Sequence, residues 1–323
     1  MMSTFDEIFS TFRIGSLELR NRIVCPPLVQ CRPITSAEGV AWYRRLAAGG
    51  ASVVIVEATG IPGIGAELTV ETLGPLVAAI HEQGAAAAIQ LFPIPFGSEA
   101  DPNTLSVADI DGIVEQYALA ATICRDAGFD GVEPHGAHGY LINQFFMPDK
   151  NARTDEYGGS LEDRCRFGVR IVERIKAATG DDLLIFYRHT PVGEAYGIDD
   201  SLEMARRLVA AGVGVLDISP AMGERTAELA APFKEALDVP VIAVGGMDDP
   251  AAAREAIRDG RCDLVAVGRQ LIADAEWPDK VRTGRTDEII TCTECNECFD
   301  DLGDWKPVGC SQWDGDPVAP FVR

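Results

Sequence analysis

Eight short apolar runs alternate with longer stretches of helical periodicity along this 323-residue chain, and this alternation constrains its fold more than any other feature. The runs are rich in Val, Ile, Leu and Ala and have no polar face, which is typical of strands buried on both sides of a parallel sheet. The predicted strands cover residues 22–27, 52–58, 86–92, 131–136, 183–189, 214–219, 240–246 and 263–268. Eight βα units of this kind predict an α/β fold, the (β/α)8 TIM barrel.

Residues at the ends of the predicted helices agree with this organisation. Polar N-cap residues stand where helices begin, at Ser106, Ser160 and Asp249, the last followed by Pro250. Glycines stand where helices end, at Gly128, Gly180, Gly212 and Gly260. A doubly wound sheet is the alternative fold, and we disfavour it because no G-x-G-x-x-G turn follows an early strand.

Composition argues against several classes of protein. Hydrophobic residues make up 47% of the chain, which is enough for a large core, yet no apolar stretch is long enough to predict a membrane span. The N-terminus MMSTFDEIFSTFRIG lacks the basic and apolar regions of a secretory signal, so we expect a cytoplasmic protein. The net charge of −22 would repel phosphate backbones, which argues against nucleic acid as a partner.

Four of the nine cysteines lie in CTECNECFDDLGDWKPVGC, residues 292–310. An odd number of cysteines in a chain expected in the cytoplasm argues against a disulfide framework and favours metal or redox use of these four. From the spacing alone, a staple, a zinc site and an electron relay all stay open. We expect residues 1–285 to form the barrel and residues 286–323 to form a C-terminal cysteine-rich segment that is not an independent domain.

Polar residues and glycines stand at the carboxyl ends of the predicted strands, where a barrel places its chemistry. They are Gln90, His135, His138, Tyr140, Arg188, Gly245, Gly246, Gly268 and Arg269. The glycines after the last two strands, together with Arg269, are the ingredients of a phosphate site, although tight turns explain the glycines equally well. Arg188 needs an anion, a polarised ring or a structural ion pair to offset the cost of its burial.

Three of these residues, His135, His138 and Tyr140, follow the fourth strand. The two histidines are either ordinary loop residues, a metal pair without a third ligand, or donors to an anionic or carbonyl oxygen. The chain has only four histidines, so two at the barrel mouth favour the last reading. Tyr140 is either a packing aromatic or a proton donor to a carbanion-like centre.

Residues 129–167, FDGVEPHGAHGYLINQFFMPDKNARTDEYGGSLEDRCRF, closely resemble the signature of the old yellow enzyme family of FMN-dependent ene-reductases. Further segments match the same family in order: LRNRIVCPPL, IQLF, YRHTP, VIAVGGMDDP and VAVGRQLIADAEWPDK. The resemblance covers nearly the whole barrel and implies an FMN in its mouth.

The resemblance assigns contacts to this flavin. Pro27, Leu28 and Ala58 match positions that contact the isoalloxazine ring largely through the backbone, and Val29 stands where relatives often have a threonine or cysteine bonded to flavin O4. The other implied contacts are Gln90 at the pyrimidine edge, Arg188 beside N1 and O2, and Gly245, Gly246, Gly268 and Arg269 at the phosphate.

The resemblance also implies a reaction. His135 and His138 match the pair that grips the activating oxygen of the substrate, and Tyr140 matches the proton donor. In the family, flavin N5 delivers a hydride to the β-carbon of an activated C=C bond while the tyrosine protonates the α-carbon.

The segment GRTDEIITCTECNECF resembles the iron–sulfur branch of the same family, which includes 2,4-dienoyl-CoA reductase and trimethylamine dehydrogenase. This resemblance implies a [4Fe–4S] cluster on Cys292, Cys295, Cys298 and Cys310. Thiolates in this spacing suit an iron–sulfur cluster, whereas zinc ribbons usually split four cysteines into two pairs; zinc and unligated thiols stay open.

We therefore expect an FMN- and [4Fe–4S]-dependent oxidoreductase that reduces an enone, an enoate or an enoyl thioester. The FAD and NAD(P)H domains of the branch have no counterpart in this sequence, so we expect electrons from NAD(P)H bound over the flavin or from a separate redox protein. The alternatives are a dehydrogenase of an amine or cyclic substrate, and a non-catalytic electron-transfer subunit. Because many family members self-associate, a homo-oligomer is a further expectation.

Overall fold

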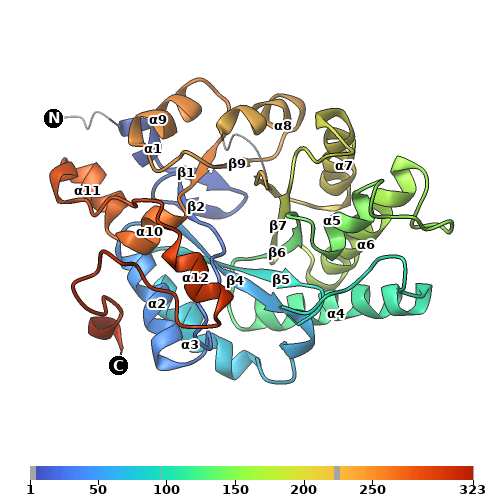
Figure 1. Ribbon diagram of the computed structural model, residues 1–323, viewed down its shortest axis with the longest axis horizontal. Helices are drawn as coiled ribbons and strands as arrows, with labels where there is room; N and C mark the ends of the chain where they lie inside the picture. Colours follow the sequence, from blue (N-terminus) through green and yellow to red (C-terminus); the bar gives the residue numbers. More distant parts are fainter. Residues whose placement is uncertain (1–4, 96, 222–225, 323) are drawn as a thin grey trace.

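The computed structural model describes residues 5–95, 97–221 and 226–322. Eight parallel strands close into a barrel in the order β10-β3-β4-β5-β6-β7-β8-β9, which confirms the predicted (β/α)8 TIM barrel (Figure 1). The strands are β3 (Ile23–Cys25), β4 (Val53–Gly60), β5 (Ala86–Phe92), β6 (Gly131–Gly136), β7 (Leu184–His189), β8 (Val215–Ile218), β9 (Val241–Val244) and β10 (Leu264–Ala266). Each overlaps its predicted range.

Helices surround the barrel. The main helices between consecutive barrel strands are α2 (Ala37–Ala48), α3 (Val70–His81), α4 (Val107–Asp126), α6 (Leu161–Thr179), α7 (Ile198–Ala211), α8 (Ala231–Ala236) and α9 (Pro250–Arg258). Short elements in the connections are α1 (Asp6–Phe9), α5 (Leu141–Phe146), α10 (Arg269–Ala273), α11 (Trp277–Thr283), α12 (Glu297–Gly303), η1 (Ile61–Gly63), η2 (Ala227–Leu229), η3 (Thr286–Glu288) and η4 (Ala319–Phe321). The predicted N-caps Ser106, Ser160 and Asp249 each accept a backbone N–H bond with their side chains, which confirms these helix starts.

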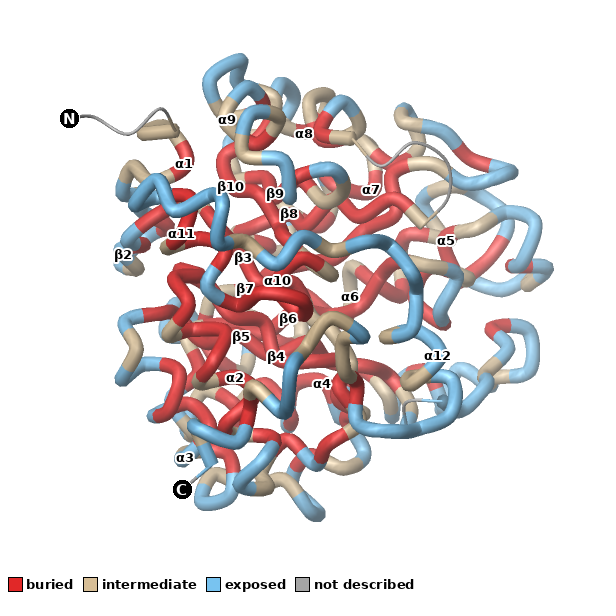
Figure 2. The backbone as a smooth tube through the Cα atoms, turned by 60° about the vertical axis from the view of Figure 1, so that its left-hand side comes forward, coloured by how far each residue is buried: buried red, intermediate tan, exposed pale blue. Residues whose placement is uncertain are grey.

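Two apolar clusters hold the barrel together. One fills its interior and includes Val24, Val53, Phe186 and Val215, while the larger one lies between the strands and the helices. An antiparallel hairpin of β1 (Phe12–Ile14) and β2 (Leu17–Leu19) adds Ile14 and Leu19 to the interior cluster and closes the end of the barrel where the strands begin. Buried backbone accordingly fills the middle of the molecule (Figure 2). Polar side chains lie at the opposite end, the mouth of the barrel, where the strands end.

The cysteine-rich segment is tied to that polar end by hydrogen bonds to backbone carbonyls. The N–H of Val308 donates to the carbonyl of Gln30, and Arg32 donates to the carbonyl of Val308, both at 3.0 Å. Farther along, the indole N–H of Trp313 donates to the carbonyl of Ala273 at the end of α10. The segment therefore rests on the loop after β3 and on α10, two of the elements that surround the barrel mouth.

Candidate active site at the mouth of the barrel

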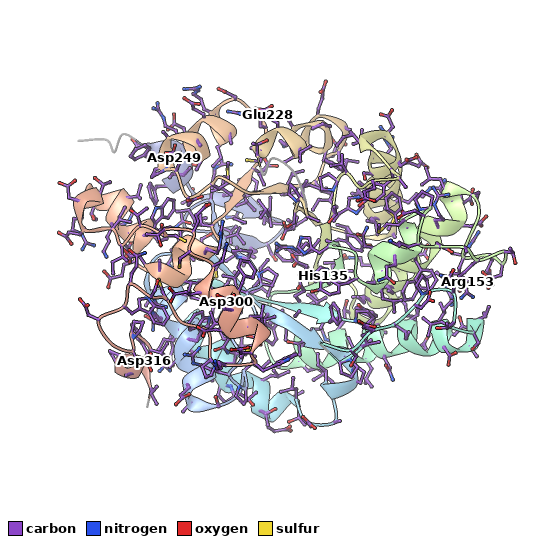
Figure 3. All side chains as sticks on the ribbon, in the orientation of Figure 1. His135, Arg153, Glu228, Asp249, Asp300 and Asp316 are labelled. Atoms are coloured by element: carbon purple, nitrogen blue, oxygen red, sulfur yellow. The ribbon has the colours of Figure 1, made fainter. Side chains whose placement is uncertain are left out.

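The register of neighbouring strands brings the polar side chains together. Between β6 and β7, His135 lies opposite Arg188, and between β7 and β8, Arg188 lies opposite Asp217. Figure 3 shows His135 beside the ends of β5 and β6, toward the middle of the molecule. Parallel pairing thus places residues that are about 80 positions apart in the sequence on one rim.

Arg188 forms a buried ion pair. Its Nη1 donates to Asp217 Oδ2 at 3.0 Å and its Nη2 donates to Ser219 Oγ at 2.9 Å. Asp217 is fully buried, and burial raises the pKa of its carboxyl although Arg188 opposes the shift. The buried Nε of Arg188 has no hydrogen-bond partner among the described residues, so the guanidinium keeps a donor for an acceptor in the mouth. The structural ion pair considered from the sequence is present, and the spare donor also fits a flavin edge.

Gln90 is oriented by a buried acid that the sequence reading missed. Its Nε2 donates to Glu133 Oε1 at 2.8 Å. Burial, together with the charge of Asp217, raises the pKa of Glu133 to about 8, so this carboxyl is mostly protonated at neutral pH. With its amide nitrogen held by Glu133, Gln90 keeps its carbonyl oxygen as an acceptor, which fits an N–H group at the pyrimidine edge of a flavin.

The hydrogen bonds of the two histidines indicate which ring nitrogen carries the proton. The backbone N–H of Ala137 donates to His135 Nδ1 at 3.3 Å, so Nε2 is the donor in neutral His135. Burial, His138 and Arg188 all hold the pKa of His135 well below its usual range, so its ring stays neutral.

Ser219 connects Arg188 to the second histidine. His138 Nε2 lies 2.9 Å from Ser219 Oγ. Arg188 donates to the same oxygen, and we expect the Ser219 hydroxyl to donate in turn to His138 Nε2, which would place the imidazole proton on Nδ1. With these bonds, the ring of His135 carries its proton on Nε2 and the ring of His138 is expected to carry its proton on Nδ1.

The loop that carries His138 has an unusual backbone. His138 has a positive φ of 60°, and Gly139 follows with a φ of 74°. The N–H of His138 donates to Thr190 Oγ1, and the N–H of Gly139 donates to Asn143 Oδ1 on α5, both at 2.9 Å. A left-handed histidine is rare and persists where surrounding bonds hold it, which favours a functional role for this position.

Tyr140 stands at the rim of the same cluster and is 38% exposed. Its ring packs edge-on against His135 and Phe92, with centroid separations of 5.1 and 4.9 Å. His135 in turn packs against His138 at 5.2 Å. The structure therefore brings the three predicted catalytic residues, His135, His138 and Tyr140, into one cluster, with the phenol on its solvent side.

The loop after β3, with Pro27, Leu28 and Val29, is anchored by a second buried acid that the sequence reading missed. Glu57 Oε2 accepts from the N–H of Gln30 at 3.1 Å and from the hydroxyl of Tyr43 at 2.8 Å. Glu57 directly precedes Ala58 on β4, so this acid joins the two segments expected to touch the flavin ring.

One of the predicted phosphate residues, Arg269, lies next to the cysteine segment. Gly245 and Gly246 have positive φ of 110° and 68°, so these glycines serve turns that side chains rarely allow. Gly268 precedes α10, and the first residue of that helix, Arg269, donates to Asn296 Oδ1 at 3.0 Å and pairs with Glu294 Oε1 at 3.1 Å. Arg269 is thus shared between the candidate phosphate site and the cysteines.

Cys292, Cys295, Cys298 and Cys310 line one small cavity together with Arg269. The N–H of Cys292 donates to Gln270 Oε1 on α10 at 2.9 Å. Between the cysteines, Glu294 and Asn296 have positive φ, so the backbone turns sharply there. Within the described ranges, no three His, Cys, Asp or Glu side chains stand close enough to hold one metal ion.

Comparison with known proteins agrees with this geometry. A family model described as the NADH:flavin oxidoreductase / NADH oxidase family matches residues 97–288. An NADH oxidase of Thermoanaerobacter brockii is 34% identical over 91% of this chain and 54% of its own length. A cinnamate reductase of Clostridium sporogenes is 30% identical over 96% of this chain and 58% of its own length. The chain spans about half the length of these curated relatives.

Solved structures of oxidoreductases are also similar to this chain. A 2-naphthoyl-CoA reductase in complex with 2-naphthoyl-CoA has a TM-score of 0.86 at 25% identity, covering 95% of this chain and 57% of that one. Histamine dehydrogenase from Rhizobium sp. 4-9 has a TM-score of 0.83 at 27% identity, covering 95% and 52%. Separately, none of the helices in the described ranges is long and apolar enough to span a membrane.

The hydrogen bond between Ser219 and His138 can be tested by replacing Ser219 with alanine. In the native protein we expect the His138 proton on Nδ1; in Ser219→Ala we expect a mixture of both tautomers, because the donor to Nε2 is lost. Long-range ¹H–¹⁵N NMR distinguishes the tautomers, and the chain has only four histidines to assign. Ser201→Ala, which removes a buried hydroxyl bonded to Pro191, is the control. A proton on Nε2 of His138 in the native protein would contradict the assignment.

The raised pKa of Glu57 makes stability depend on pH. Burial raises the pKa of Glu57 from 4.5 to about 7. Its stabilising contribution is complete below pH 4.5 and is lost as the pH rises through 7. We expect the native protein to lose about 3 kcal/mol more unfolding free energy than Glu57→Gln between pH 4.5 and 8. Urea unfolding of both proteins at the two pH values measures this difference, and equal losses would contradict it.

Proposed function

Because the chain belongs to the NADH:flavin oxidoreductase / NADH oxidase family, it is a flavin-dependent oxidoreductase, and we propose that it reduces an activated C=C bond with FMN and a [4Fe–4S] cluster. The observation that carries the proposal is the cluster of His135, His138 and Tyr140, in which two imidazole rings pack edge-on beside an exposed phenol. This arrangement suits an α,β-unsaturated carbonyl compound, whether enone, enoate or enoyl thioester.

In the proposed reaction, His135 Nε2–H and His138 Nδ1–H donate to the carbonyl oxygen of the substrate. Their donation stabilises the negative charge that grows on this oxygen when the β-carbon gains a hydride. The Tyr140 hydroxyl then gives its proton to the α-carbon, which completes the saturated product. The cluster is neutral at His135, so it binds an oxygen without adding a fixed positive charge.

The remaining predicted residues fit an FMN in the mouth. When bound, FMN supplies the hydride from N5. Arg188, through its spare Nε, and the carbonyl oxygen of Gln90 would hold the pyrimidine edge, where negative charge on a reduced flavin is stabilised by a cation. The loop of Pro27, Leu28 and Val29, with Ala58, would contact the ring, and Gly245, Gly246, Gly268 and Arg269 would bind the phosphate.

The proposed [4Fe–4S] cluster is supported by the four thiols that line one cavity, with Arg269 between them and the candidate phosphate site. Each cysteine of such a cluster binds its own iron, so the four sulfurs surround a space larger than a single ion needs. Electrons would reach the flavin through this cluster from a separate redox protein, or directly from NAD(P)H.

Two other functions are alternatives to this proposal. A dehydrogenase that passes electrons outward is favoured by the similarity to histamine dehydrogenase. Two N–H donors at the reacting position disfavour an ammonium group there, so we place this function second. A non-catalytic electron-transfer subunit is third, since such a protein needs no proton donor at Tyr140. We also propose a homo-oligomer in the cytoplasm.

The proton-donor role is tested with Tyr140→Phe. We expect enone reduction by the pre-reduced enzyme to slow by about 10²- to 10⁴-fold, because a phenyl ring has no proton to give. Reduction of the flavin by NADPH or dithionite should keep its rate, since that step needs no proton from Tyr140. Anaerobic stopped-flow absorbance separates the two steps. An unchanged enone rate would overturn the proton-donor role, whereas no enone reduction by either protein would favour the electron-transfer subunit.

The metal is tested by analysis of anaerobically purified protein. We expect about four iron and about four acid-labile sulfide per chain, as a [4Fe–4S] cluster requires. Cys310→Ser should lose most of the iron, whereas Cys165→Ser, at a buried cysteine on α6, should keep it. Zinc in place of iron, or iron content unaffected by Cys310→Ser, would overturn the cluster proposal.

A further inference from the structure

A cleft of about 580 Å³ opens on the side of Tyr140 away from the histidines. One wall is formed by residues that follow β5. The other is formed by residues of α5 and by residues just before and just after this helix. Phe92 and Tyr140 belong to both the cleft and the catalytic cluster, because each lines the cleft and packs against the ring of His135. The cleft therefore borders the candidate active site, with the rings of Phe92 and Tyr140 at the boundary.

The walls of the cleft are tied to each other by hydrogen bonds. Asn103 Nδ2 donates to the carbonyl of Lys150 at 2.9 Å, and the N–H of Ala152 donates to Asn103 Oδ1 at 2.7 Å. The guanidinium of Arg153, labelled in Figure 3, donates to the carbonyls of Pro102 and Leu105. These bonds join the loop after β5 to the segment after α5, so the cleft is built into the fold and not a gap between independent loops.

The charge of the lining is predominantly negative. Glu99, Asp101 and Asp149 contribute three carboxylates, and Lys150 contributes one ammonium group. Lys150 Nζ lies 3.6 Å from Asp149 Oδ2, so this pair is internally compensated. Among the described residues, the side chain of Asp101 accepts from neutral donors, the backbone and side-chain N–H groups of Asn103. Within the described ranges, Glu99 and Asp101 thus form no ion pair, in a chain whose net charge is −22.

Neutral hydrogen-bonding groups complete the lining, with Ser98 and Gln144 beside Asn103. A substituent that enters the cleft therefore meets hydrogen-bond partners and a negative potential. The negative potential stabilises a bound cation and repels a carboxylate or phosphate. It has little effect on the binding of a neutral polar group, which can still form hydrogen bonds.

We propose that this cleft is a second subsite of the substrate pocket, which holds a neutral or cationic substituent of an unsaturated carbonyl substrate and rejects an anionic one. The proposal deepens the function proposed above and rests on it. With the carbonyl oxygen on His135 and His138, the part of the substrate beyond Tyr140 extends into the cleft. Within the substrate classes left open, neutral or cationic enones are then preferred over free enoates and over thioesters of phosphate-bearing carriers.

The test uses the holoenzyme and three 4-phenylbut-3-en-2-ones that differ only in the para substituent: trimethylammonium, hydroxymethyl and carboxylate. We expect kcat/KM for the cation to exceed that for the anion by at least about tenfold at low salt, with most of the difference in KM, because the charge is remote from the reacting carbons. The ratio should fall toward one in 0.5 M NaCl, since the cleft is open to solvent.

Two variants locate the effect. Glu99→Gln removes a carboxylate from the cleft, and we expect the cation-to-anion ratio to fall several-fold. Glu235→Gln makes the same change in net charge at the end of α8, just before β9 begins at the closed end of the barrel, and it should leave the ratio and the basal activity unchanged. Equal ratios for the three compounds, or equal effects of the two variants, would overturn the subsite.

Calorimetric binding of the same three compounds separates this proposal from the proposed function. If they bind with the expected order of affinity but none is reduced, the reductase function fails and the subsite stands. If all are reduced at similar kcat/KM, the function stands and the subsite fails. If none binds and none is reduced, both fail.

Discussion

The buried ion pair between Arg188 and Asp217 is the interaction on which the rest of the site depends. Removing one partner would leave an uncompensated charge inside the barrel, at a cost of about 3–5 kcal/mol. The pair also acts on its neighbours. The charge of Asp217 raises the pKa of Glu133, which orients Gln90, and Arg188 occupies Ser219 so that the serine can donate to His138. One charge pair therefore organises both the flavin side and the substrate side of the mouth.

The cysteine segment is joined to this mouth through two contacts that originate in the flavin-binding elements. The loop after β3 continues from Val29 into Gln30, which bonds both Glu57 and Val308. On the other side, Arg269 and the following glutamine reach from α10 to the turns between the cysteines. A connection of this kind would suit the proposed electron transfer, because it would keep the distance between the two proposed cofactors constant.

Local patterns were enough to predict the strands and the positions of His135, His138, Tyr140 and Arg188. Strand ends in a parallel barrel share one face, so a polar residue at the end of an apolar run is a strong signal. Glu57, Glu133 and Asp217 gave no such signal, because each lies within an apolar run and its meaning depends on a residue of another strand or helix. Nothing in the sequence distinguishes Ser219 from other loop serines. Its role follows from its contacts with Arg188 and His138 in the structure.

The sequence by itself determined the barrel, since buried strands and capped helices follow from the periodicity of apolar side chains and from the residues at helix ends. It also determined which residue types stand at the mouth, and the family to which they point. Only the tertiary structure decided the raised pKa of Glu133, the hydrogen-bond partners of the two histidines, the sharing of Arg269 and the acidic cleft beside Tyr140. These properties arise from burial and from charges brought together by strand register, and neither can be read from one strand alone.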